Sequence, residues 1–244
     1  LLVLEIPRTN DKQELAAEQL FASLHGILRD NKELRLSGGH QEHISFEIAS
    51  VNGQIRFYVW VPKTLQSFVE GQIYSQYPTV QIHQADEDYT EHERDHEVAY
   101  STELTLTTDE FLPIRTFQNF EVDPLAGITG TLAKLETTGE ELWIQVLVRP
   151  IPDDWQNAAD RYINNIRNGR MFSLPGFGGN MQWLIGVLGA LWQPPEQGVG
   201  QSTKIELSDR DKTRISEAEK KATKLGYEVK IRLVYMGESQ TNAK

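Results

Sequence analysis

The sequence predicts an α+β protein made of two ferredoxin-like (βαββαβ) halves, the second with a long apolar Gly/Pro-rich insertion. Three observations support this class. Segments with the two-residue period of a strand alternate with segments that have the period of an amphipathic helix. An Asn-Gly pair separates two of the strands, and capping residues or prolines mark most helix ends. A composition of 39% hydrophobic and 24% charged residues is typical of a globular protein with its own core.

Residues 1–85 form the first predicted half. The expected elements, in chain order, are a strand at 1–6 closed by Pro7, a helix from a cap at Asn10 or Asp11 to Leu28, strands at 43–50 and 54–61, a helix capped by Thr64 that stops before Pro78, and a strand at 79–83. Asn52 and Gly53 supply the positive φ angles of a type I′ turn, so the two middle strands should form a hairpin.

An acidic linker, residues 86–99, leads to the second half, residues 100–238, and a tail follows at 239–244. The expected elements are a strand at 102–107, a helix that begins at Asp123-Pro124, a strand at 141–149, a helix from Asp153 that fades near Gly169, a helix from Ser208, and a last strand at 227–235. Residues 169–203 interrupt this half as the insertion. The halves do not align closely in sequence, so the expected repeat is one of architecture.

Charge and cysteine content narrow the functional classes. A net charge of -11 argues against nonspecific binding to the phosphate backbones of nucleic acids. Because the chain has no cysteine, it can hold no disulfide, thiolate nucleophile or cysteine-ligated metal. The apolar start lacks the charged region of a signal peptide, and Leu1 in place of a methionine suggests a piece of a longer protein.

The stretch EHERDHE, residues 91–97, contains the H-E-x-x-H pattern of zinc proteases in His92, Glu93 and His96. A zinc-binding helix normally packs as the wall of a cleft, whereas this motif lies in a run of acids, DEDYTEHERDHE. On a helix several of these acids would be like-charged pairs one turn apart, which is unfavourable. We therefore expect a solvated acidic loop, with a zinc hydrolase as the competing hypothesis.

The insertion contains an uncharged stretch from Met171 to Gln193. Its apolar core is too short to cross a bilayer, which takes about 20 residues. Three interpretations are open: packing on the chain's own core, docking to another subunit, or an interfacial membrane anchor. The residues expected to make such contacts are Trp183, Leu184, Ile185, Leu188 and Trp192. No phosphate-binding glycine motif or serine-hydrolase elbow is present, so we expect no cofactor and no catalytic residue.

A second candidate interaction surface lies on the predicted strand 54–61. Its residues Arg56, Tyr58 and Trp60 alternate with the apolar positions and should point away from the helices. RNA-recognition domains of the same βαββαβ order stack bases on such aromatics, which makes single-stranded nucleic-acid binding an alternative function. The acidic charge opposes that alternative. We expect instead that Tyr58, Trp60 and Trp143 pack against another sheet or a neighbouring domain.

Several segments together carry a family resemblance: AAEQLFASLHG, ISFEI, IRFYVWVP, GQIYSQYP, LPIRTF, DPLAGI, LWIQVLVRPIPDDW and GYEVKIRLVY. They resemble an accessory domain found before the motor of type IV secretion and conjugative DNA-transfer ATPases of the HerA/FtsK/TraG-like kind in small-genome bacteria. The resemblance covers most of the chain and includes no catalytic motif. It implies an upstream membrane helix and a downstream RecA-like ATPase, neither of which lies in this sequence.

The expected function is therefore non-catalytic. We expect a cytoplasmic module, at the inner face of the cell membrane, that helps to assemble or position such an ATPase. Its expected partners are the downstream motor domain or other secretion-system subunits, with membrane-surface contact through residues 171–193, and it could form an oligomer.

Overall fold

The computed structural model describes residues 1–7, 14–91, 98–116, 119–121, 123, 125–135, 139–168 and 207–237. The chain divides into two compact units. Unit 1 comprises Leu1–Asp109, Ile114–Asp153 and Leu225–Lys244, and unit 2 comprises Glu110–Pro113 and Asp154–Lys224. Among the described residues, unit 1 holds every strand and unit 2 holds two long helices.

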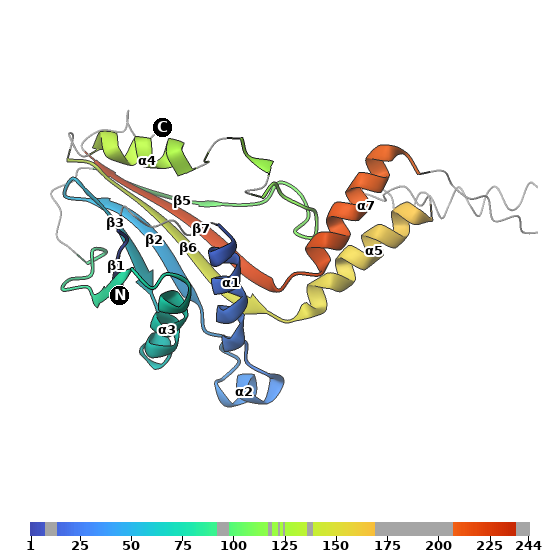
Figure 1. Cartoon of the computed structure of the whole chain (residues 1–244), viewed down its shortest axis with the longest axis horizontal. Coiled ribbons are helices and arrows are strands. Elements are labelled where there is room, and N and C mark those ends of the chain that lie inside the picture. The colour runs from blue at the N-terminus through green and yellow to red at the C-terminus, as the bar shows by residue number, and fades with distance from the viewer. Residues whose placement is uncertain are drawn as a thin grey trace, which may run out of the picture. The chain divides into compact units, whose positions relative to one another are not determined.

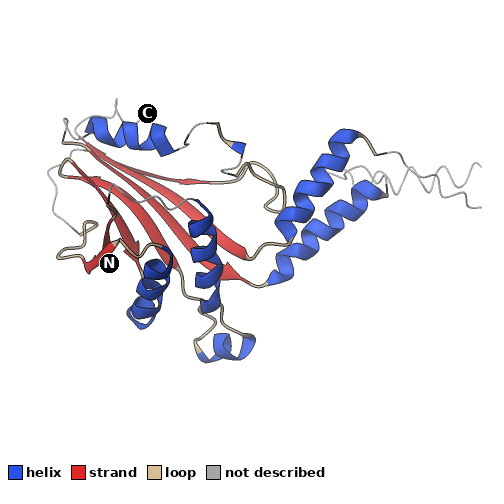
Figure 2. Ribbon diagram, viewed as in Figure 1, coloured by secondary structure: helices blue, strands red, loops and turns tan. Residues whose placement is uncertain are grey.

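Unit 1 is built on one sheet of seven strands in the order β4-β1-β3-β2-β6-β7-β5 (Figures 1 and 2). Every neighbouring pair is antiparallel. The strands are β1 (Leu2–Glu5), β2 (Ile44–Val51), β3 (Gln54–Trp60), β4 (Gln81–Gln84), β5 (Val98–Leu104), β6 (Glu141–Ile151) and β7 (Gly226–Gly237).

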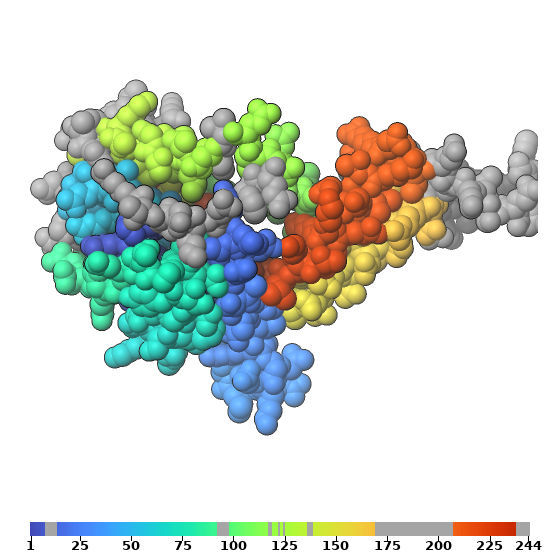
Figure 3. Space-filling view, in the orientation of Figure 1, coloured from blue at the N-terminus to red at the C-terminus, as the bar shows by residue number. Residues whose placement is uncertain are grey.

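Helices of unit 1 cover one face of this sheet, which we call the helical face. They are α1 (Glu14–Leu24), α3 (Gln66–Gln76) and α4 (Leu125–Leu135), with short 3-10 turns η1 (His25–Ile27) and η2 (Lys63–Leu65). The short helix α2 (Asn31–Leu36) buries no residue and lies beyond the end of α1, away from the sheet (Figure 1). α1 and α3 lie side by side (Figures 1 and 3). Their Leu20, Leu24 and Val69 pack with Leu2 and Val59 of the sheet in the largest buried cluster.

The predicted order of the first half is confirmed: β1, α1, β2, β3, α3 and β4 follow one another in the chain. The hairpin turn is confirmed as well, since Asn52 has φ 51° and Gly53 has φ 71°. The predicted cap at Thr64 is wrong, because η2 occupies that position and α3 starts after it without a side-chain cap. Helix α2 was not predicted; Asp30 caps it, accepting hydrogen bonds from the backbone N–H groups of Lys32 and Glu33.

The second half contributes three strands among the described residues, β5, β6 and β7. The predicted helix at Asp123 is present as α4, and the Asp123 carboxylate accepts a hydrogen bond from the N–H of Leu125 at 2.9 Å. β6 pairs along β2, with Ile44 opposite Val148 and Ser50 opposite Leu142. The strands before and after the acidic segment therefore belong to one continuous sheet. A second βαββαβ unit is not confirmed.

Unit 2 contains a helical hairpin of α5 (Gln156–Arg167), preceded by the turn η4 (Asp153–Trp155), and α7 (Asp209–Ala222). Tyr162 and Ile163 of α5 and Ile215 and Ala218 of α7 form its core. The Nζ of Lys221 donates to the carbonyl of Leu112 at 2.9 Å and also to that of Glu110, which fastens residues 110–113 to α7. Burial lowers the pKa of the Lys221 amine from 10.5.

The predicted start of α7 is confirmed. Ser208 precedes the helix in an extended conformation, and its hydroxyl oxygen accepts a hydrogen bond from the N–H of Asp211 at 3.2 Å. The two acids of the first turn, Asp209 and Asp211, also favour this helix end because they face the positive end of the helix dipole.

Candidate functional site

The predicted interaction residues of β3 and β6 lie on the sheet face opposite the helical face. Glu47 is opposite both Tyr58 and Gln145 in the strand register, and Ala49 is opposite both Arg56 and Trp143. Tyr58 and Trp143 belong to a buried cluster that contains no residue of α1 or α3. The expected orientation away from the helices is therefore confirmed for Tyr58, and Trp143 shares this face.

Tyr89, from the acidic segment 86–91, covers these aromatic residues, so we call this sheet face the Tyr89 face. Its ring centroid lies 4.8 Å from that of Tyr58 and 4.8 Å from that of Trp143, the latter in an edge-to-face arrangement at 86°. Tyr58 is 5% exposed and Trp143 is 7% exposed. The chain's own acidic segment packs on both residues, where the sequence led us to expect another sheet or a neighbouring domain.

A hydrogen-bond network holds Tyr89 in place. Its hydroxyl donates to Oε2 of Glu47 at 2.5 Å and accepts a hydrogen bond from Nε2 of Gln145 at 3.0 Å. Glu47 and Gln145 are both buried, and a buried carboxylate is costly unless a donor satisfies it. Burial, and then the negative charge of Glu47, raise the pKa of the Tyr89 phenol above its usual 10.0, so it stays protonated as the donor.

The other two predicted residues of β3 differ in accessibility. Trp60 is half-buried and stacks on the imidazole of His43, with ring centroids 4.8 Å apart and an interplanar angle of 17°. Arg56 is exposed, and its guanidinium donates to Oε1 of Gln54 at 2.7 Å. Burial lowers the pKa of the His43 ring from 6.5, and the charges of His40 and Arg149 act in the same direction. Of the predicted residues on this face, Arg56 and Trp60 therefore remain accessible.

The remaining predicted site residues lie outside the described residues. These are His92 and His96 of the zinc pattern and the insertion residues Trp183, Leu184, Ile185, Leu188 and Trp192. In the part of the chain that the structure describes, no group of three or more His, Cys, Asp or Glu side chains is arranged to hold a metal ion. None of the described helices has the length and apolar character that crossing a membrane requires.

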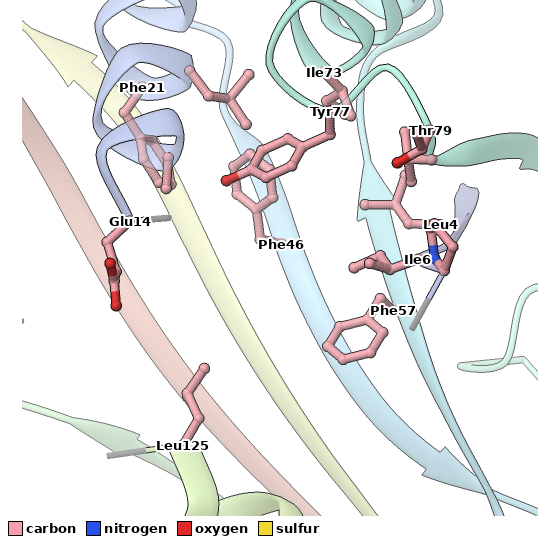
Figure 4. Close-up of a pocket in the computed structure, with 14 residues that line it drawn as sticks. Leu4, Ile6, Glu14, Phe21, Phe46, Phe57, Ile73, Tyr77, Thr79 and Leu125 are labelled. Carbon is pink, nitrogen blue, oxygen red and sulfur yellow. The ribbon is translucent and has the colours of Figure 1, made fainter. Parts of the chain in front are cut away.

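An apolar cavity of about 640 Å³ lies on the helical face (Figure 4). Its walls come from α1 and α3, from the sheet beneath them, and from Leu125 at the start of α4. Among the described lining residues, Phe21, Phe46, Phe57 and Tyr77 are aromatic, and Glu14 is the one that carries a carboxylate. Burial raises the pKa of the Tyr77 phenol from 10.0. The described lining residues can take up apolar groups, and they include no paired acid and base for catalysis.

The sheet ends in an exposed strand that sequence reasoning did not identify as a site. β5 forms one edge of the sheet (Figure 1), and every residue from Ala99 to Leu104 is exposed. Its Tyr100 is 42% exposed and Leu104 is 55% exposed, and Val229 on the neighbouring β7 is 49% exposed. Together Tyr100, Leu104 and Val229 form an uncovered apolar strip next to a strand edge. An edge with adjacent apolar side chains is a common site of strand addition by another chain.

In its described residues the chain is an α+β protein whose unit 1 has one antiparallel sheet, helices on one face of it and an open edge strand. Comparison with family models identifies the family: residues 3–244 match the domain of unknown function DUF8128, and the chain belongs to this family. Comparison with curated proteins and with solved structures gave no match.

Proposed function

We propose that this chain is a non-catalytic protein–protein contact module that assembles or positions a membrane-associated secretion or conjugation ATPase. The open edge of β5 with its apolar strip is the observation that supports this proposal most. Edge strands with exposed backbone groups pair with strands of other proteins, and apolar side chains beside the edge add contact area. The type of partner comes from the sequence resemblance, which implies an ATPase motor domain downstream or another secretion-system subunit.

The same resemblance supports one related proposal, and the order of the strands supports another. The module acts at the inner face of the cell membrane, next to the motor. Its architecture derives from ferredoxin-like halves; the order β4-β1-β3-β2 supports this for residues 1–85, and the second half supports it through three strands.

The test is copurification of the 244-residue chain with the motor domain that the resemblance implies downstream of it. Leu104→Glu and Val229→Lys place charges in the apolar strip and should reduce complex formation at least tenfold. Leu36→Glu is a matched control, because Leu36 on α2 is 81% exposed and lies outside the strip. A chain that stays monomeric and ignores motor, membrane vesicles and oligonucleotides would contradict the proposal.

The zinc-hydrolase alternative predicts stoichiometric zinc that is lost in His92→Ala. The nucleic-acid alternative predicts salt-sensitive oligonucleotide binding that collapses in Trp60→Ala. Coverage of Tyr58 by Tyr89 weighs against the second alternative, since base stacking needs an open ring face.

A further inference from the structure

In the described part of the chain, the outer edge of β5 has none of the features that usually prevent edge strands from pairing with other chains. Its sequence VAYSTEL has no proline or lysine and one charged residue, Glu103. The Glu103 carboxylate accepts a hydrogen bond from Nη2 of Arg232 on β7 at 3.2 Å, so its charge is compensated within the chain. Seven residues are long enough for a full two-stranded ladder.

We propose that β5 pairs with β5 of a second copy of this chain, antiparallel about a two-fold axis through Ser101, to form one sheet across the dimer. The inferred dimer rests on the proposed function and identifies a second copy of the chain as one of the partners of the contact module. Ser101 is the middle residue of the strand, so pairing centred on it uses the whole strand. An interface of this kind is isologous, with the same residues contributed by both copies.

The strand is self-complementary in this register. Val98 lies opposite Leu104 of the second copy, Tyr100 opposite Thr102, and Ala99 opposite Glu103. The two Glu103 side chains are thereby kept apart, and each faces a small apolar residue. Like charges directly opposite one another would destabilise the pair, and this register avoids them.

The apolar strip also becomes continuous in the dimer. Tyr100 and Leu104 share the helical face with Tyr235 and Ile231, their partners on β7. Across the two-fold axis Leu104 meets Val98 of the second copy, and Tyr100 lies diagonal to the Tyr100 of that copy, which removes exposed apolar surface from water. The contact is at the low end of interface sizes, so we expect a reversible, concentration-dependent dimer.

Opposite charge changes at one position test the register. Sedimentation of the full chain at increasing concentration should show a monomer–dimer equilibrium. Ala99→Glu, which sets a carboxylate opposite Glu103, should raise the dissociation constant at least tenfold, and Ala99→Lys should lower it. Gln84→Glu and Gln84→Lys make the same charge changes on the exposed β4 edge and should leave it unchanged.

A disulfide crosslink tests whether the two-fold axis passes through Ser101. The chain has no cysteine, so Ser101→Cys introduces the only thiol, and mild oxidation should link the dimer covalently. Paired residues of antiparallel strands are close enough for a disulfide. A monomer at all concentrations, or identical responses to the Ala99 and Gln84 variants, would overturn the β5 pairing. A monomer that still binds the motor leaves the proposed function standing, and a dimer that ignores the motor removes the proposed function instead.

Discussion

The substitution Tyr89→Phe removes one hydroxyl from the buried network of the Tyr89 face and keeps the ring that packs on Tyr58 and Trp143. The hydroxyl donates to the buried Glu47 carboxylate and accepts from Gln145. A hydrogen bond to a charged group contributes about 1.5–3 kcal/mol, and its loss leaves the carboxylate without that donor. We expect the free energy of unfolding to fall by about 2–3 kcal/mol. For a chain of this length that corresponds to a fall of roughly 5–10 °C in Tm.

Urea unfolding, followed by tryptophan fluorescence and by circular dichroism, measures this change. Tyr74→Phe is the matched control, because Tyr74 is 41% exposed and its hydroxyl lies on the surface of α3. A double-mutant cycle with Glu47→Gln isolates the pair, and the two changes should be non-additive by about 1 kcal/mol or more. If Tyr89→Phe loses no more stability than Tyr74→Phe, the hydroxyl does not fasten the acidic segment to the sheet and the reasoning fails.

Three further predictions concern titration and capping. Burial raises above 10.0 the pKa values of Tyr89 and of Tyr227 on β7, whose hydroxyl donates to the backbone carbonyl of Phe21 at 2.6 Å. The stability that these two hydroxyls contribute is therefore complete below about pH 10 and is lost as the pH rises further, and Tyr89→Phe should reduce this loss in urea unfolding between about pH 8 and about pH 11. Burial lowers the pKa of His43 below 6.5, so its stability contribution is present above pH 6.5 and is lost as the pH falls; an NMR titration midpoint at or above 6.5 would contradict this. Ser208→Ala removes the cap of α7 and should cost about 1 kcal/mol, while Ser208→Asp should keep most of it; equal unfolding curves for the two variants would refute the capping role.

Local patterns were enough to predict most elements. Alternation of apolar and polar residues located β2, β3, β6 and β7, and the positive φ angles of Asn52 and Gly53 follow directly from their residue types. Ser208 and Asp123 marked helix starts because a side-chain acceptor is needed there. Strand alternation, turn residues and helix caps each depend on residues a few positions apart in the chain, so they can be predicted from the sequence.

The Tyr89 network could not be predicted in the same way. Tyr89 lies in an acidic stretch that reads as solvated, and its partners Glu47 and Gln145 are 42 and 56 residues away. Only the tertiary pairing of β2 with β6 brings Glu47 and Gln145 together under Tyr89. A signal was present, since Tyr89 is an aromatic residue among acids and Glu47 is the one charged residue of β2. Nothing in either segment indicates that these two side chains bind one another.

Continuity of the sheet was also beyond local patterns. β2 and β6 each carry the composition of a central strand, but nothing in either segment specifies the other as its neighbour. The exposed edge at β5 follows from this same strand order, because the position of a strand in a sheet depends on which strands remain for it to pair with.

The position of β7 between β6 and β5 has a consequence for how the protein is made. β5 ends at Leu104, yet its only strand partner in the described part of the chain begins at Gly226, more than a hundred residues later. On a ribosome that adds about 5–20 residues per second, β5 waits several seconds with both edges unpaired. Closure of such a long loop is slow, and an unpaired strand can associate with other nascent chains in the meantime. Expression yield should therefore respond to translation speed and to chaperones that bind extended segments.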